Sequence, residues 1–340
     1  MNELELIKEF RADLPGPSAA ATAHARRAWE QPGQEPRRSR GPRLTPRIAI
    51  AGAVAAAAIC AALMLPADKD GDIGAGQAQA AETLRLAAGA QHGGLDRPLR
   101  PGEFWYVKRR TAYATSAGDD YTFIQPQVRE DWVAADGTRR WRTAPVGPPR
   151  FPTEQDRKRW EQRGRLLAGQ GKVSEFTHRP RPGAVPFRLA DEPMTYGKLL
   201  ALPRDPATLY RRFHDAAVEC ECGNSVDQET FVLVGDFLRD APLPTDLRAA
   251  VLRAAALIPG IRLIPDERDL AGRMGVGVGF DSDGRRNVLV FDRQTHELLG
   301  EHERLIEDQG FAPAGFVISG SADIESGVVD SITARPAPRG

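Results

Sequence analysis

Apolar residues change their spacing along the chain in an order that predicts strands, then helices, then strands. Segments 102–115 and 121–144 are rich in aromatic and β-branched residues, which is typical of strands. Between residues 205 and 260 the apolar residues instead recur every three or four positions, the period of amphipathic helices. Strand-like segments return from residue 261. This order favours an α+β domain built on an antiparallel sheet.

The helical region divides into three segments, 205–219, 225–242 and 244–260, of which the second ends at Pro242 and the third at Pro259-Gly260. The second opens with Ser225 and, three residues later, Gln228, which is a capping-box pattern. A helix is also expected around residues 80–90.

Two turn signals lie between strand-like runs. Asp136-Gly137 predicts a hairpin turn, and so does the DSDG sequence at 281–284. Residues 153–168 are polar with a weak apolar stripe and predict a surface helix, whereas the proline-rich segment 177–193 predicts a long loop.

Residues 48–66 are the most apolar part of the chain. Ile48 to Leu65 is 18 residues without a charge, and nine of them are alanine. A helix of that length spans about 27 Å, which suffices for a bilayer core. A cleavable signal peptide is the alternative, since AQA at 78–80 resembles a cleavage site. The long preceding segment and the distance to that site favour an uncleaved signal-anchor in the cell membrane.

The flanking charges predict how the anchor is oriented. Seven arginines lie between residues 26 and 47, and "ADKDGDIG" after the anchor has one lysine and three aspartates. Because positive flanks stay in the cytoplasm, the N-terminus is expected inside and the C-terminal domain outside. The chain as a whole is neutral, with 46 basic and 46 acidic residues, so nothing marks it as a nucleic-acid binder.

The predicted divisions follow from these patterns. They are cytoplasmic amphipathic helices at 1–30, a basic disordered linker at 31–47, a transmembrane helix at 48–66, a linker at 67–80 and an extracytoplasmic α+β domain at 81–335.

The N-terminal tail carries an apolar stripe at helical spacing, formed by Leu4, Ile7, Phe10 and Leu14. A short helix cannot bury this stripe alone, so it needs a partner. A protein groove and the membrane surface are both candidates.

Several stretches, read in order, carry a family resemblance. NELELIKEFRADLPGPSAAATAHARRAWE, one membrane segment, LPRDPATLYRRF, LRAAVLRAAALIPGIRLIP and VFDRQTHELLGEH together resemble a family of actinobacterial single-pass membrane proteins often encoded beside sigma factors. The layout resembles that of anti-sigma regulators, and the outer domain resembles the curved half-barrel of lipoprotein carriers and of the sensor RseB. The resemblance implies a sigma factor as a partner of the tail, but it supplies no catalytic or binding residues.

Cys220 and Cys222 are the main candidates for chemistry. With His214 nearby they suggest a metal, but a structural zinc site needs four ligands and this region lacks a second pair. Outside the cell a disulfide between the two or a pair of free thiols fits better. No cofactor or metal is therefore expected.

A glycine stripe lies on one predicted strand, at Gly275, Gly277 and Gly279. It suggests either close approach of a helix to that face or room for an apolar ligand inside a curved sheet. The chain contains no nucleophile elbow, zinc-protease motif or phosphate-binding loop, which argues against an enzyme. The sequence thus predicts a membrane-anchored extracytoplasmic sensor that modulates a sigma factor. The alternative is a membrane-tethered carrier of lipid or lipoprotein with an apolar envelope ligand.

Overall fold

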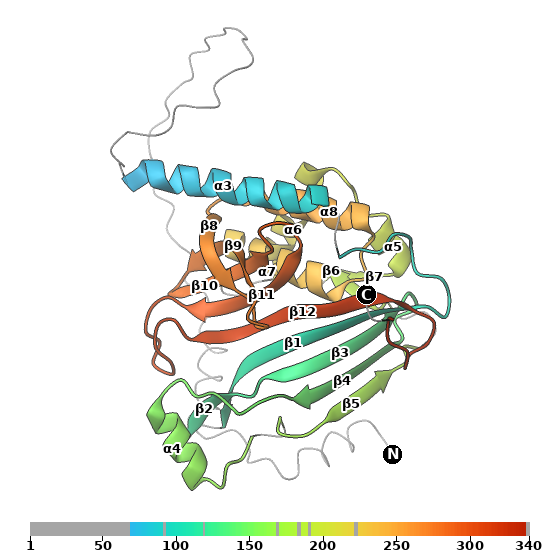
Figure 1. Cartoon of the computed structure of the whole chain (residues 1–340). Coiled ribbons are helices and arrows are strands. Elements are labelled where there is room, and N and C mark those ends of the chain that lie inside the picture. Colours follow the sequence, from blue (N-terminus) through green and yellow to red (C-terminus); the bar gives the residue numbers. More distant parts are fainter. Residues whose placement is uncertain are drawn as a thin grey trace, which may run out of the picture. The chain divides into compact units, whose positions relative to one another are not determined.

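A ten-stranded antiparallel sheet joins the two strand-rich parts of the sequence (Figure 1). At its centre β1 (Phe104–Ala117) pairs with β12 (Val317–Val329), which are the first and last strands of the described region. On one side follow β3 (Gln127–Ala134), β4 (Arg139–Pro145) and β5 (Ser174–His178), while β2 (Tyr121–Ile124) pairs with the end of β1. On the other side follow β11 (Leu298–Leu305), β10 (Arg285–Phe291), β9 (Met274–Ser282) and β8 (Arg262–Arg268). The predicted α+β class with a large antiparallel sheet is confirmed.

The computed structural model describes residues 69–90, 93–117, 120–167, 170–181, 185–189, 192–220 and 224–337. The chain divides into two units, 1–63 and 64–340, and all described residues belong to the second. None of the described helices is both long and apolar enough to span a bilayer. The predicted anchor at 48–66 and the tail stripe lie outside the described residues, so both stay predictions.

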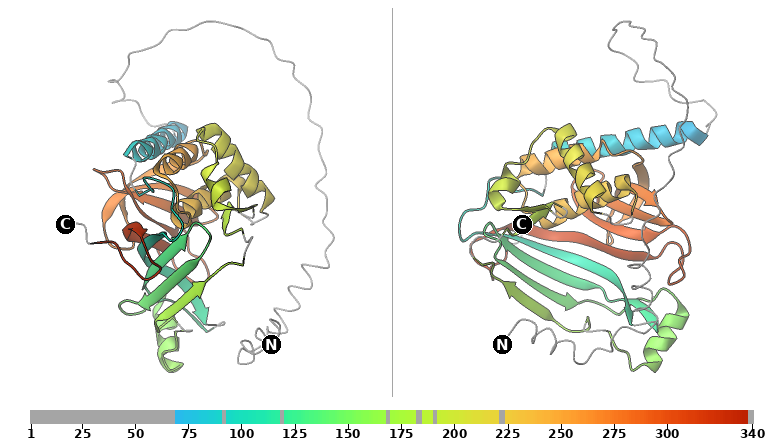
Figure 2. Two further views of the ribbon diagram at one scale, coloured as in Figure 1. Left: turned by 90° about the vertical axis from the view of Figure 1, so that its right-hand side faces the viewer. Right: turned by 180° about the vertical axis from the view of Figure 1, so that it is seen from behind.

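A layer of helices lies against one face of the sheet at its β8–β10 end, while β3, β4 and β5 extend away from it (Figures 1 and 2). It consists of α3 (Lys69–Ala90), α6 (Pro206–Glu219), α7 (Val226–Asp240) and α8 (Thr245–Ala255). Val278, Phe280 and Leu289 project from the sheet into the same hydrophobic core as the helices. We call this side of the sheet the helix-facing face and the opposite side the outer face.

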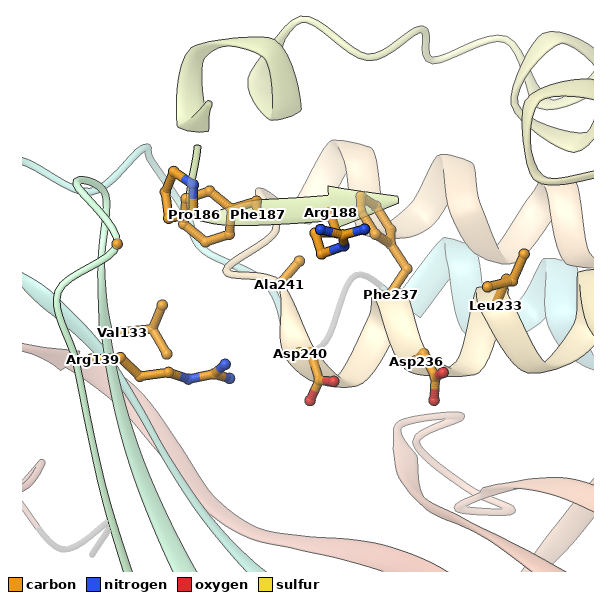
Figure 3. A pocket seen from close by; sticks show the side chains of 11 residues that line it. Val133, Arg139, Pro186, Phe187, Arg188, Leu233, Asp236, Phe237, Asp240 and Ala241 are labelled. Atoms are coloured by element: carbon orange, nitrogen blue, oxygen red, sulfur yellow. The ribbon is translucent and has the colours of Figure 1, made fainter. Parts of the chain in front are cut away.

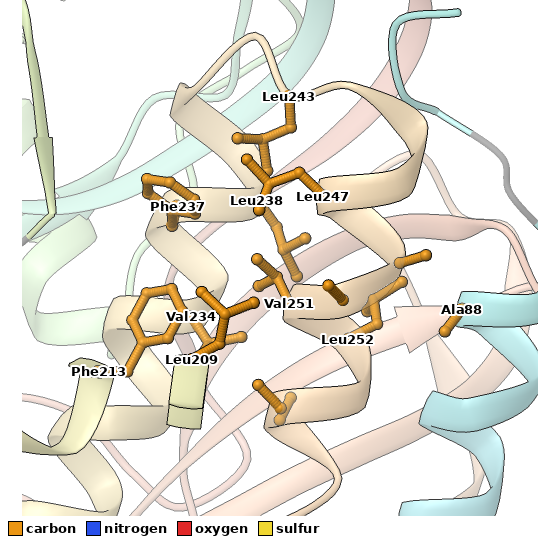
Figure 4. Close-up of a cluster of buried hydrophobic side chains, with 14 of the residues drawn as sticks. Ala88, Leu209, Phe213, Val234, Phe237, Leu238, Leu243, Leu247, Val251 and Leu252 are labelled. Carbon is orange, nitrogen blue, oxygen red and sulfur yellow. The ribbon is translucent and has the colours of Figure 1, made fainter. Parts of the chain in front are cut away.

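The helix layer is held together by the apolar positions that the periodicity picked out (Figure 4). Phe213 of α6 is fully buried and meets Phe237 of α7 edge-on, with ring centroids 5.6 Å apart. The hydroxyl of Ser225 accepts a hydrogen bond from the Gln228 backbone N–H, as predicted. The Gln228 amide instead donates across to Asn287 on β10, so this side chain docks the helix rather than completing the capping box.

The predicted linker at 67–80 and the predicted helix at 153–168 both need correction. Residues 69–80, expected within a linker, are helical: α3 begins at Lys69, and no proline interrupts the stretch, although it holds as many glycines as alanines. The helix expected at 153–168 is shorter, since α4 runs over Glu154–Gln162 and Gly164 with φ +77° follows it.

The loop expected at 177–193 contains structure. The strands β6 (Phe187–Leu189) and β7 (Glu192–Met194) pair within it and lead into α5 (Tyr196–Leu200). The side chains of Phe187, Leu189 and Met194 are buried in the main core. Tertiary burial therefore orders a segment whose composition alone indicates a loop.

Both hairpin turns form where the sequence predicts them. Gly137 has φ +83° between β3 and β4, and Asp283 and Gly284 have φ +51° and +72° between β9 and β10. Asp283 and Gly284 form a two-residue loop, and positive φ at both of its residues matches the twist of the flanking strands. At Gly137 a Cβ would also lie 2.1 Å from Pro186, so this glycine lets the β3–β4 turn touch the segment before β6.

The glycine stripe of β9 faces away from the helices. A Cβ at Gly275 would lie 2.3 Å from the Phe291 carbonyl oxygen, and at Gly277 and Gly279 it would press on Val288 and Ile264. Neither sequence interpretation holds: within the described residues, the atoms nearest to these glycines come from the neighbouring strands β8 and β10 rather than from a helix, and they fill the space beside the stripe. The stripe instead lets the β8–β11 end of the sheet curl toward its outer face.

Candidate functional site

Potential metal ligands do not cluster in the part of the chain that the structure describes. Nowhere in the described ranges do three or more His, Cys, Asp or Glu side chains gather as metal ligands. Cys220 ends α6 as its C-cap and is a disulfide cysteine, while Cys222 lies outside the described residues. Their pairing therefore stays a prediction.

A cleft lies between α7, the β3–β4 turn and β6, and we call it the α7 cleft (Figure 3). It has a volume of about 280 Å³. Its apolar wall comes from Val133, Phe187, Leu233 and Phe237. Its charged side chains come from Arg139, Arg188, Asp236 and Asp240. The cleft thus combines an apolar wall with charges of both signs.

The two acidic residues of the cleft are spaced four apart on α7, so they share one side of the helix. Figure 3 shows both carboxyl groups on the sheet side of α7, with the Arg139 guanidinium reaching toward Asp240 from β4. Burial alone would raise the pKa of Asp240, but the surrounding guanidinium groups of Arg239, Arg109 and Arg139 together outweigh burial and hold the pKa below its ordinary value. Asp240 is therefore an anion at neutral pH.

The positive charge of Arg139 is only partly compensated by a neighbouring carboxylate. Its side chain is 34% exposed, and its Nε lies 3.9 Å from an Asp131 carboxyl oxygen. That Nε is buried and has no hydrogen-bond partner within the described part of the chain. A polar atom of a bound ligand could accept a hydrogen bond from this N–H group.

Arg239 anchors α7 above the sheet. Its guanidinium contacts Asp236 at 2.6 Å, Asp240 at 3.1 Å and Glu301 of β11. A Cβ at position 235 would lie 2.9 Å from the Glu301 carboxylate, so Gly235 permits this close approach of helix and sheet.

Beneath Arg239, the floor of the helix-facing face is also charged. Arg109 of β1 is 5% exposed and pairs with Asp323 at 2.6 Å and with Asp131 at 3.8 Å. Its Nη2 donates to the Arg239 backbone carbonyl at 2.5 Å, and Arg248 donates to the Leu238 carbonyl at 2.8 Å. Cations at a helix C-terminus satisfy its free carbonyls and oppose its dipole.

A second cavity of about 140 Å³ adjoins the α7 cleft, with which it shares Asp236. Its lining includes Tyr113, Asn287, Glu303 and Ser319 from the strands below α7. Tyr113 is 47% exposed, so a partly exposed aromatic ring lines the second cavity.

The sequence patterns did not indicate the α7 cleft. The run Asp236-Phe-Leu-Arg-Asp240 is the signal that could have found it, because three charges interrupt the apolar face of a predicted helix next to its end. Arg109 and Glu301, which contact Arg239, are far away in the sequence, and only the strand register brings them together.

The resemblance to an actinobacterial family stays a prediction. No family model, no curated protein and no solved structure matches this chain.

Proposed function

We propose that this chain is a membrane-anchored regulatory protein whose extracytoplasmic domain binds a ligand in the α7 cleft. The anchor at 48–66 and its orientation are supported by the apolar run and its arginine-rich flank. The observation that carries the binding function is the cleft itself, a hollow with an apolar wall and opposed charges. Such a mixture of convergent polar groups and apolar surface is typical of binding sites.

The charges define the kind of ligand that fits. Asp236 and Asp240 share the Arg239 guanidinium, but their side chains are 48% and 53% exposed, so carboxylate oxygens remain open to a cationic group. Arg139 on the other side offers donors to an anionic or carbonyl oxygen. Phe187 and Phe237 supply apolar surface between them. A short peptide segment carries all three features in one molecule, so a peptide is the proposed ligand class.

The carrier alternative has less support. An acyl chain would have to cover the charged floor around Arg109 and Asp131, and burying such groups under hydrocarbon is costly. The space beside the glycine stripe, where an apolar ligand was considered, is occupied by Ile264 and Val288.

The ligand class can be tested by thermal unfolding of the full chain in nanodiscs. We expect a pool of synthetic tripeptides carrying both charges to raise the melting temperature by about 5–10 °C at a hundredfold excess over Kd. The variant Asp240→Asn combined with Arg139→Gln should lose this shift, whereas Arg253→Gln on the exposed side of α8 should keep it.

The same measurement with lysophosphatidylcholine below its micelle concentration should leave the melting temperature unchanged. Stabilisation by this lipid and not by the peptides would reject the peptide-binding function in favour of the carrier.

The regulatory role depends on the tail. We expect residues 1–47 to retain a sigma factor encoded beside this gene in a pull-down. Phe10→Asp should abolish retention, because it places a charge in the middle of the stripe formed by Leu4, Ile7, Phe10 and Leu14. Arginine-to-glutamine changes at 37–43 serve as the control and should leave retention intact. A tail that binds anionic vesicles but no sigma factor would contradict the regulatory role.

A further inference from the structure

The curled end of the sheet brings two distant strands into contact. β8 and β11 are separated by β9 and β10 in the sheet order, which in a flat sheet would keep them about 14 Å apart. Yet Glu267 Oε1 of β8 lies 3.7 Å from His302 Nε2 of β11 on the outer face. An irregularity in register between Ile264 and Glu267 turns the end of β8 over the sheet.

Three charged or titratable side chains meet at this contact. Glu267 and His302 are 5% and 4% exposed, and Arg304 of β11 pairs with the Glu267 carboxylate. Glu267 Oε2, His302 Nδ1 and Arg304 Nε are buried without a hydrogen-bond partner among the described residues. We call these three residues the outer-face triad. Its polar groups are only half satisfied, which makes the contact sensitive to any change of charge.

The geometry requires His302 to be neutral. Arg304 Nη2 lies 3.1 Å from His302 Nε2, and a guanidinium can only donate, so Nε2 must be the acceptor. If Nε2 were protonated, two hydrogen-bond donors, Arg304 Nη2 and His302 Nε2, would face each other. Both side chains would be positively charged, with the Glu267 carboxylate as their shared counter-ion. Beyond the triad, Asp269 also acts on His302, but its carboxylate is already bound by Arg273 at 2.5 Å.

The electrostatics agree with this geometry. Burial lowers the pKa of His302 from 6.5 to about 4, although Glu267 acts in the opposite direction. A histidine whose pKa is lower in the closed state stabilises that state fully above pH 6.5. The stabilisation is lost as the pH falls from 6.5 toward 4.

β8 links the triad to α3, because Glu267 lies near the end of this strand while α3 contacts the strand and the residues before its start. The two elements pack against each other, and Gly260, just before β8, donates its N–H to the Gln77 side chain of α3. The loop after β8 is held on the sheet by Arg273, which donates to the Leu299 carbonyl at 2.9 Å and to the Asp323 carbonyl at 2.7 Å.

We propose that the outer-face triad is an acid-released latch: protonation of His302 detaches the end of β8 and residues 269–273 from β11 and thereby loosens α3. This inference rests on the proposed membrane anchoring, because α3 would then be the element nearest the anchor in the chain. It does not depend on the ligand of the α7 cleft.

Hydrogen–deuterium exchange of the full chain in nanodiscs at pH 7.5, 5.5 and 4.5 tests the latch. After correction for the chemical exchange rate, the opening of β8 should increase up to about tenfold per pH unit between pH 6.5 and 4. Exchange in residues 74–90 of α3 should increase with it. His302→Gln keeps an acceptor for Arg304 but cannot be protonated, so its β8 should stay protected at all three pH values.

His214→Gln is the matched control, because His214 is 38% exposed on α6 and should leave the pH response unchanged. If His302→Gln fails to fold, Arg304→Gln serves instead, since it lets protonated His302 pair with Glu267 and should remove the acid release. Unchanged β8 protection in the wild type at pH 4.5, or an undiminished pH response in the folded variant, would overturn the latch. If β8 opened while the exchange of α3 did not change, the proposed coupling of β8 to α3 would be wrong. Loss of peptide binding with an intact latch would refute only the cleft function.

Discussion

Arg109→Leu is expected to lower the free energy of unfolding by about 2–4 kcal/mol, because it breaks a charge-assisted hydrogen bond to a partly exposed carboxylate and leaves a carbonyl at the end of α7 without its donor. The substitution leaves Asp323 without its 2.6 Å partner and removes the donor to the Arg239 carbonyl at the end of α7. Asp131 keeps Arg129 at 2.8 Å, so the loss arises mainly between the sheet and α7.

Urea denaturation of the full chain in detergent, followed by tryptophan fluorescence, measures this loss, because Trp132 is fully buried. Arg110→Leu is the matched control. Arg110 is the exposed neighbour on the same strand, and its replacement should change stability by no more than about 0.5 kcal/mol. Equal effects of the two substitutions would show that the charged floor does not hold α7 in place.

Phe213→Ala should cost about 3–5 kcal/mol, because it removes a fully buried ring from the centre of the helix layer. The cavity would open against Phe237, whose ring meets Phe213 edge-on. The same urea titration measures the effect, with Val218→Ala as the control on the same helix. Val218 is 54% exposed, so its truncation should be close to neutral. A loss below about 1 kcal/mol for Phe213→Ala would mean that α6 contributes little to the core.

Local chemistry explains which parts of the fold the sequence predicts. The Asp136-Gly137 turn and the turn at 281–284 depend on residues that tolerate positive φ, which a short stretch of sequence reveals. The helices α6, α7 and α8 have apolar faces within their own residues, and Pro242 and Pro259 follow α7 and α8 within a few residues as stop signals. Interactions within a few residues are therefore visible before the fold is known.

Long-range packing explains the parts that were missed. The β6–β7 hairpin is ordered because Phe187 and Met194 enter a core built by distant helices. The α7 cleft and the outer-face triad depend on strand register and on the curl of the sheet. His302 appeared only as one residue of a strand, since its partner Glu267 is 35 residues away in the sequence.

The pairing of β1 with β12 has a consequence for how the domain forms. Arg109 and Asp323 are 214 residues apart, so the central seam closes a very long loop and gives the sheet a high contact order. Until β12 leaves the ribosome, β1 and β11 each lack their shared neighbour and present unpaired backbone groups. A chain that emerges from its N-terminus therefore completes this domain only once β12 has been synthesised, and a chain that has not reached β12 exposes two edges that can template aggregation.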